Sequence, residues 1–174
     1  MSPSEARDRE LRAVRWVPAP PSRVWTACTT KRGLEAWWSP EDLRTSVRRL
    51  EVRTGGSVVI DLRYAPALLL PGTSESFRAA GVPIRLTLRG ILREVVEERL
   101  LLFDLNLDLD RAGAGVGLRT RLEMAPEGSG TRVTIVGTGS DTPHWARFGE
   151  RNLEAQLERL DRHLAGSRAA SPAP

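Results

Sequence analysis

The sequence has 174 residues and a mass of 19.2 kDa, which is the size of one domain. Its balance of 40% apolar and 28% charged residues is typical of a globular chain and argues against disorder. No apolar run approaches the roughly 20 residues that a membrane helix needs, so we expect no stable membrane insertion. The first residues lack the apolar stretch of a secretory signal, and the single cysteine, Cys28, excludes an internal disulfide and a four-cysteine zinc site. We therefore expect a cytoplasmic protein.

The basic residues do not indicate nucleic-acid binding. Lys31 is the one lysine among 26 basic residues, and 22 acidic residues reduce the net charge to +4. Arginine alternates with aspartate and glutamate along most of the chain, whereas nucleic-acid binders gather their basic residues on one face. We expect a solvated surface rich in ion pairs and no nucleic-acid partner.

The first elements form an elbow. The segment 11–17 reads as a short strand that the prolines at 18, 20 and 21 bring to an end. Proline suits the first turn of a helix, so a short helix is predicted over 21–29 and a second short helix or turn over 33–38.

From residue 47 the apolar period changes to two, which indicates strands. Predicted strands cover 47–53, 58–64, 84–96 with a bulge at Gly90, 101–109, 116–124 and the segment around 133–135. With the first strand this gives about seven strands in a mostly antiparallel sheet that has one apolar and one solvated face. The solvated face carries Arg85, Arg89, Asp104, Asp108, Arg119 and Arg121. Residues 65–81 lack a clear period and are predicted as a loop or a short helical excursion.

The last element is a long amphipathic helix. It is predicted to start at Asp141-Thr142-Pro143 and to run to Leu164. One stripe of this helix carries Trp145, Gly149, Leu153, Leu157, Leu160 and Leu164. An apolar sheet face needs a cover, and this is the one long helix predicted. The fold class is therefore α+β, with a single domain over 11–165 and flexible tails at 1–10 and 166–174.

Sequence motifs for catalysis are missing. The chain has no phosphate-binding loop, dinucleotide fingerprint, nucleophile elbow or zinc-protease motif. The two histidines, His144 and His163, are too far apart on one helix to bind the same metal. We predict no catalytic residue, no metal and no cofactor.

Two amides interrupt the apolar stripe. Asn152 and Gln156 fall on its flank, where a closely packed helix would carry leucine. A buried amide without partners costs about 1–3 kcal/mol. Either these amides lie at the edge and bond to water or sheet backbone, or they are the polar anchors of a cavity between helix and sheet. Ligand pockets are mostly apolar with a few placed polar groups, which fits the second interpretation.

The order of elements and several local motifs resemble a known family. Four stretches carry the resemblance: Ala19-Pro20-Pro21-Ser22-Arg23-Val24-Trp25-Thr26-Ala27, Leu34-Glu35-Ala36-Trp37-Trp38-Ser39-Pro40, Arg53-Thr54-Gly55-Gly56 and the segment Gly90 to Leu100. They are similar to the heat-shock protein 90 ATPase-activator-like branch of the START-like, birch-pollen-allergen-like superfamily (SRPBCC). The resemblance covers roughly residues 11–164. It implies a helix-grip fold, in which a curved antiparallel sheet surrounds a long C-terminal helix.

This resemblance implies a hollow protein that binds a hydrophobic or amphipathic small molecule, lipid-like or polyketide-like, without catalysis. A polyketide cyclase or aromatase-like enzyme in the same cavity is one alternative, and it would need Arg15, Arg85 or His144 to point inward. A co-chaperone-like interaction module is another, although the co-chaperones carry an N-terminal domain that this sequence lacks. The sequence leaves monomer and homodimer open. The residues predicted to bind the ligand are Trp38, Leu34, Phe77, Phe103, Trp145, Gly149, Asn152 and Gln156.

Overall fold

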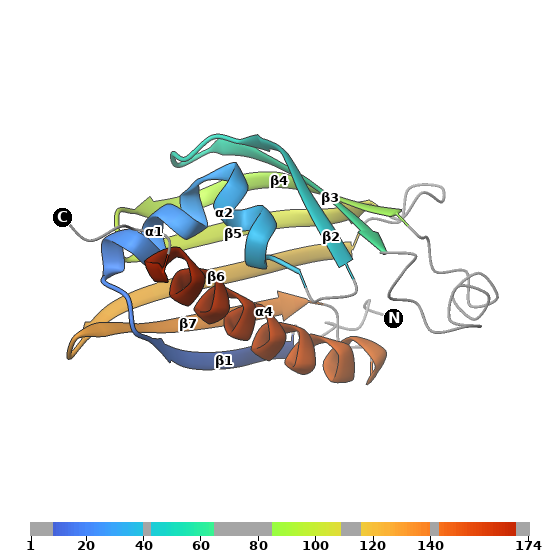
Figure 1. Cartoon of the computed structure of the whole chain (residues 1–174). Coiled ribbons are helices and arrows are strands. Elements are labelled where there is room, and N and C mark those ends of the chain that lie inside the picture. Colours follow the sequence, from blue (N-terminus) through green and yellow to red (C-terminus); the bar gives the residue numbers. More distant parts are fainter. Residues whose placement is uncertain (1–8, 40–42, 65–84, 109–115, 140–142, 170–174) are drawn as a thin grey trace, which may run out of the picture.

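The computed structural model describes residues 9–39, 43–64, 85–108, 116–139 and 143–169. One sheet of seven strands curls around a long helix, with two short helices at one end (Figure 1). This is the predicted α+β helix-grip fold. The strands are β1 (Arg9–Val17), β2 (Leu43–Leu50), β3 (Gly56–Tyr64), β4 (Arg85–Val96), β5 (Leu100–Asp108), β6 (Val116–Glu127) and β7 (Gly130–Gly139).

The sheet is antiparallel throughout, in the order β1-β7-β6-β5-β4-β3-β2. Strands β2 to β7 follow the chain through successive neighbours, and β1 closes the other side of the sheet against β7. Period-two alternation places one apolar set on the inner face, under the helix. In β5, for example, Leu101, Phe103 and Leu105 are almost completely buried on that face.

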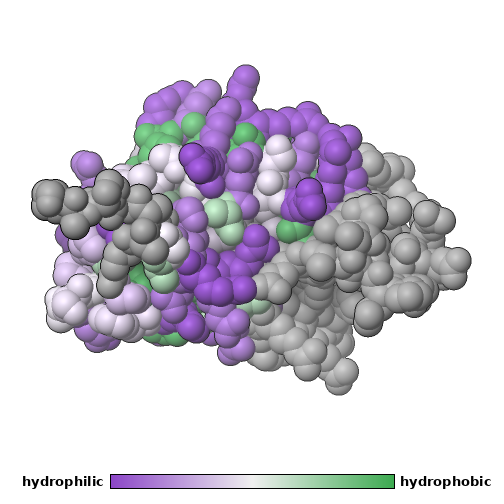
Figure 2. All heavy atoms as spheres, in the orientation of Figure 1, coloured by the Kyte–Doolittle hydropathy of each residue, from purple (hydrophilic) through white to green (hydrophobic). Residues whose placement is uncertain are grey.

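Ion pairs cover the outer face, as the alternation predicts. Asp104 on β5 accepts hydrogen bonds from Arg93 (2.9 Å) and Arg119 (3.4 Å) on the two neighbouring strands. The hydrogen bond from Arg93 is the main reason why the pKa of Asp104 lies below its usual range. The opposite, helix-bearing side of the molecule, seen in Figure 2, is also mostly hydrophilic over its described residues.

The short helices α1 (Pro21–Thr29) and α2 (Lys31–Trp37) make the predicted elbow, with Pro21 in the first turn of α1. Thr30 joins them, because its hydroxyl caps α2 by accepting from the backbone N–H of Gly33 at 3.1 Å. A Cβ on Gly33 would overlap the carbonyl oxygen of Ala27, so glycine permits this close approach.

Helix α4 (Pro143–Ala169) crosses the inner face of the sheet diagonally (Figure 1). Its buried stripe is made by Leu153, Leu157, Leu160 and Leu164, as predicted. Asp161 on α4 accepts a hydrogen bond at 3.0 Å from Arg15 on β1, the edge strand of the sheet. This bond fixes the edge of the sheet to the helix. The helix extends beyond Leu164 into the segment predicted as a tail. No described helix is long and apolar enough to span a membrane.

Two local predictions are wrong. Gly90 is not a bulge: it pairs in regular register with Val58 and Leu105, and the irregularity of β4 lies between Leu92 and Glu94. Glycine is needed at position 90 because a Cβ would overlap the carbonyl oxygen of Asp104 on β5.

The predicted strand over 47–53 also differs from β2, which ends at Leu50. Glu51 ends the strand because it organises the turn into β3. Its backbone N–H donates to the carbonyl of Ser57, and its carboxylate accepts from the Ser57 N–H at 3.1 Å.

Candidate functional site

A cavity of about 130 Å³ lies between the inner face of the sheet, the end of α2 and α4. It occupies the half of the sheet that is remote from α1, where β3 and β5 end and β4 begins. Its lining is predominantly apolar. The described residues that line it are Leu11, Trp38, Ser39, Leu43, Leu62, Leu86, Leu88, Leu105, Leu107, Leu118, Arg119, Thr120, Gly137, Thr138, Asn152, Leu153 and Gln156.

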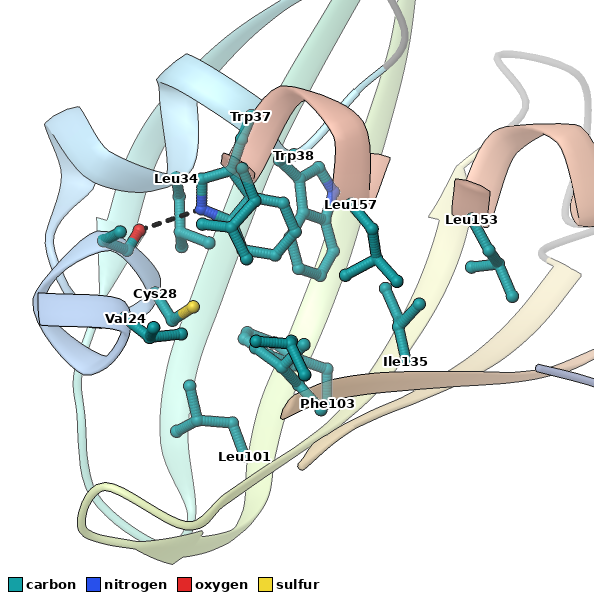
Figure 3. Close-up of a cluster of buried hydrophobic side chains, with 14 of the residues drawn as sticks. Val24, Cys28, Leu34, Trp37, Trp38, Leu101, Phe103, Ile135, Leu153 and Leu157 are labelled. Carbon is teal, nitrogen blue, oxygen red and sulfur yellow. Dashed lines mark hydrogen bonds between the residues drawn. The ribbon is translucent and has the colours of Figure 1, made fainter. Parts of the chain in front are cut away.

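The inner face is filled at one end and hollow at the other. Near α1 and α2, Trp38 packs on Phe103 with ring centroids 4.9 Å apart, and Trp37 lies 5.8 Å from Trp38 (Figure 3). Further along β5, Leu105 faces the cavity instead of an aromatic ring. Gly137 on β7 adds no side chain, although a Cβ there would make ordinary contact with Leu153 at 3.6 Å. Large side chains therefore close one half of the sheet only.

Gln156 connects α4 to the end of α2. It is 7% exposed, and its Nε2 donates to the backbone carbonyl of Trp38, the residue that ends α2. Arg159, one turn further along α4, donates from Nη2 to the carbonyl of Ala36 at 3.0 Å. The last carbonyls of a helix have no partner within it, so these two side chains satisfy α2 from outside.

Two amide oxygens in the cavity wall have no protein partner. Asn152 Oδ1 and Gln156 Oε1 are inaccessible to solvent and accept no hydrogen bond within the described part of the chain. Gln156 cannot correct this by turning its amide over, because Oε1 would then face the carbonyl oxygen of Trp38. The amide nitrogen of Gln156 thus bonds to the end of α2 and not to the sheet backbone.

The charged side chains described near the cavity point away from it. Arg119 lines it, but its guanidinium pairs with Asp104 on the outer face and its side chain is 54% exposed. Arg15 bonds to Asp161 at the sheet edge, and Arg85 bonds to Asp61 at 3.1 Å on the outer face. His144 belongs to the part of α4 whose side chains are not described. The described lining residues include no carboxylate, histidine, cysteine or lysine that could transfer a proton.

Two other groups with altered pKa values lie outside the cavity. Burial raises the pKa of the Cys28 thiol far above its usual range, so this cysteine is unreactive in the folded protein. Burial, followed by the charges of Arg32 and Arg23, lowers the pKa of His163 near the end of α4. Among the described residues, no group of three histidine, cysteine or acidic side chains is placed to hold a metal.

The predicted ligand-binding residues divide into three groups. Trp38, Asn152 and Gln156 come together in the cavity wall. Leu34 and Phe103 are fully buried in the neighbouring core, where Phe103 supports Trp38. Phe77 lies outside the described residues, as do the side chains of Trp145 and Gly149.

Sequence reasoning missed most of the apolar lining. These residues are the inward positions near the strand ends, such as Leu62, Leu86 and Leu107, together with Thr120 and Gly137. The alternation identifies them as inward, but it does not show which inward positions meet α4 and which meet the cavity. Gly137 was the available signal, since a glycine at an inward strand position leaves space beside it.

A family profile described as activator of Hsp90 ATPase homolog 1-like protein matches residues 18–165. The chain belongs to this family. The match begins directly after β1 and covers the elbow, strands β2 to β7 and most of α4, which confirms the branch that the sequence motifs indicated. A search among curated proteins gave no significant match.

Solved structures repeat the fold of this activator-like chain at low sequence identity. A protein from Chromobacterium violaceum is 22% identical with a TM-score of 0.68, over 89% of this chain and 96% of its own. The AHSA1 protein from Silicibacter pomeroyi is 18% identical with a TM-score of 0.68, over 91% and 99%. DynU16, a protein in the dynemicin biosynthetic locus, is 18% identical with a TM-score of 0.64, over 91% of this chain and 48% of its own.

Proposed function

We propose that the protein binds or carries a hydrophobic or amphipathic small molecule in the cavity between sheet and α4, and that it does so without catalysis. One observation carries this proposal: an apolar cavity whose wall holds two solvent-inaccessible amide oxygens without partners. A core selected only for stability would fill such a space with leucine, because buried acceptors without partners destabilise the fold.

The ligand is lipid-like or polyketide-like, and at least one ring-sized or short branched group of it enters the cavity. An apolar cavity of about 150 Å³ takes up benzene, and the cavity here, at about 130 Å³, is close to that size. The apolar lining supplies the affinity and the amides supply the orientation.

Thermal unfolding in the presence of a library of small apolar compounds tests this proposal. A ligand that binds the folded state alone stabilises it by about 2.7 kcal/mol at 100 times Kd, which raises Tm by several degrees. Leu118→Phe, which puts a larger side chain into the half-buried end of the cavity, should abolish the stabilisation while the variant stays folded. If no compound raises Tm and native mass spectrometry detects no bound molecule, the proposal is wrong.

A cyclase-like enzyme is a second candidate, since the chain shares its fold with DynU16. The positions of Arg15 and Arg85 in ion pairs outside the cavity favour the carrier over the enzyme. If the protein turns over an aromatic polyketide mimic and Leu118→Phe does so equally well, the reaction does not take place in the cavity.

An Hsp90-linked role is the remaining alternative, and the family name alone supports it. We expect the purified chain to leave the ATP turnover of Hsp90 unchanged, as measured with both proteins at micromolar concentration. A clear acceleration would favour the interaction module. We also place the protein in the cytoplasm, in accord with its single cysteine, which is buried and free.

A further inference from the structure

The two amide oxygens in the cavity wall specify which hydrogen-bonding group the ligand carries. Asn152 and Gln156 are four residues apart on α4, so their side chains lie on one face of the helix, one turn from each other. An amide oxygen accepts hydrogen bonds and cannot donate them. A molecule that satisfies both oxygens must therefore bring hydrogen-bond donors to this side of the cavity.

The orientation of Gln156 is fixed, which makes the donor requirement definite. Its Nε2 is engaged with the carbonyl of Trp38, and its side chain is more than nine-tenths buried. This bond uses one of the two Nε2 hydrogens and fixes the orientation of the amide, and Oε1 is the atom that has no partner. Ser39, which follows Trp38 and also lines the cavity, does not compete for it, because its hydroxyl is bonded to the carbonyl of Leu43 (3.1 Å) and the hydroxyl of Thr45 (2.6 Å).

The charges of the residues that line the cavity indicate whether the ligand's polar group is neutral or ionic. The cationic side chain of Arg119 is held by Asp104 on the outer face, so an anionic ligand would meet two acceptor oxygens and no described cation. A cationic ligand would lose its hydration in a cavity whose described lining has no carboxylate. A neutral hydroxyl group loses least on entry and gains a hydrogen bond to one of the two oxygens.

Given the proposed function, on which this step rests, we infer that the ligand enters the cavity with a neutral, hydroxyl-bearing, ring-sized group whose hydroxyl donates to Asn152 Oδ1 or Gln156 Oε1. The chemical class is a phenol or a cyclic alcohol, as opposed to a carboxylic acid, a phosphate or a pure hydrocarbon.

Phenol, toluene and benzoate serve as probes because they have one ring size and differ in the polar group. Binding of each to the full chain is measured by ligand-observed NMR or calorimetry, for the wild type and for Asn152→Leu and Gln156→Leu. A hydrogen bond of ordinary strength corresponds to about 3–10-fold in Kd. The variant that removes the accepting oxygen should therefore weaken phenol by about 3–10-fold. Both variants should leave toluene unchanged or tighter, and benzoate should bind weakest to the wild type.

The same change at exposed Asn106 on the outer side of β5 is the matched control, and Asn106→Leu should leave all three affinities as they are. If the wild type binds toluene but the preference for phenol is unaffected by both cavity variants, the hydroxyl inference is wrong and the apolar carrier stands. If benzoate binds tightest, the inference is also wrong. If no probe binds at all, the proposed function fails with it.

Discussion

Replacing Gln156 by glutamate exchanges one buried amide for a carboxyl group of the same shape. At neutral pH the new carboxylate would sit against the carbonyl of Trp38, which Gln156 Nε2 now satisfies, with no described cation in the cavity. Both burial and the facing carbonyl oppose ionisation, so the pKa of the introduced carboxyl should be raised in the folded state. An increase of about 2–3 units corresponds to about 3–4 kcal/mol lost at high pH.

The pH dependence of this loss has a definite sign. A carboxyl group with a raised folded pKa contributes its full stability below the unfolded value of about 4.3, and this is lost as pH rises through the folded pKa. When protonated, the group donates its O–H to the Trp38 carbonyl in place of the amide. The deficit of Gln156→Glu should thus be small near about pH 4 and reach its maximum by about pH 8.

The free energy of unfolding of both proteins is measured at several pH values by urea titration, with tryptophan fluorescence as the signal. Glu154→Gln is the matched control, because the same exchange is made in reverse at an exposed position of α4 and should change the free energy of unfolding by less than about 0.5 kcal/mol. Gln156→Leu separates charge from hydrogen bonding. It leaves the Trp38 carbonyl unpaired but removes the unpartnered Oε1, so the two effects offset each other to within about 1 kcal/mol. If Gln156→Glu is as stable as the wild type at every pH, the side chain is solvated and the cavity argument fails.

Three further predictions concern the frame around the cavity. Gly90→Ala should destabilise the fold by about 2–4 kcal/mol, because its Cβ would overlap the backbone of Asp104; a loss under about 1 kcal/mol by urea unfolding would contradict the register described. Trp37→Phe should cost about 1–3 kcal/mol, since it removes the buried hydrogen bond from Nε1 to the carbonyl of Ala27 (3.0 Å, Figure 3) and leaves a space; an unchanged Tm would show that the core adjusts fully. The lowered pKa of His163 means that the unfolded chain binds a proton more readily, so stability should fall as pH drops below 6.5, and His163→Gln should flatten this slope; an equal slope in both proteins would assign it to other groups.

The candidate site shows how far pattern alone can lead. The flank position of Asn152 and Gln156 follows from counting 100° per residue, and the sequence therefore marked both amides as anomalous. Their partners do not follow from it, because the Trp38 carbonyl is 118 residues away from Gln156 in the chain. Leu34 and Phe103 were predicted to touch a ligand but lie in the filled half of the core, since inward orientation does not distinguish core from cavity. The predicted bulge at Gly90 was wrong for a related reason. A glycine in a strand indicates either a bulge or a close approach of another backbone, and the position of the neighbouring strand decides between the two.

What the sequence determined by itself was the set of elements, the face that each one buries, and the family. These depend on local periods of two and 3.6 residues, on prolines and glycines at turns, and on short motifs such as the one that leads into α1. What only the tertiary structure decided was where the inner face stays hollow. That depends on the diagonal along which α4 crosses the sheet, and on Trp38 and Phe103 filling one half while Leu105 and Gly137 leave the other open. Packing of this kind is a property of side chains brought together from strands and helices far apart in the chain, so no local pattern encodes it.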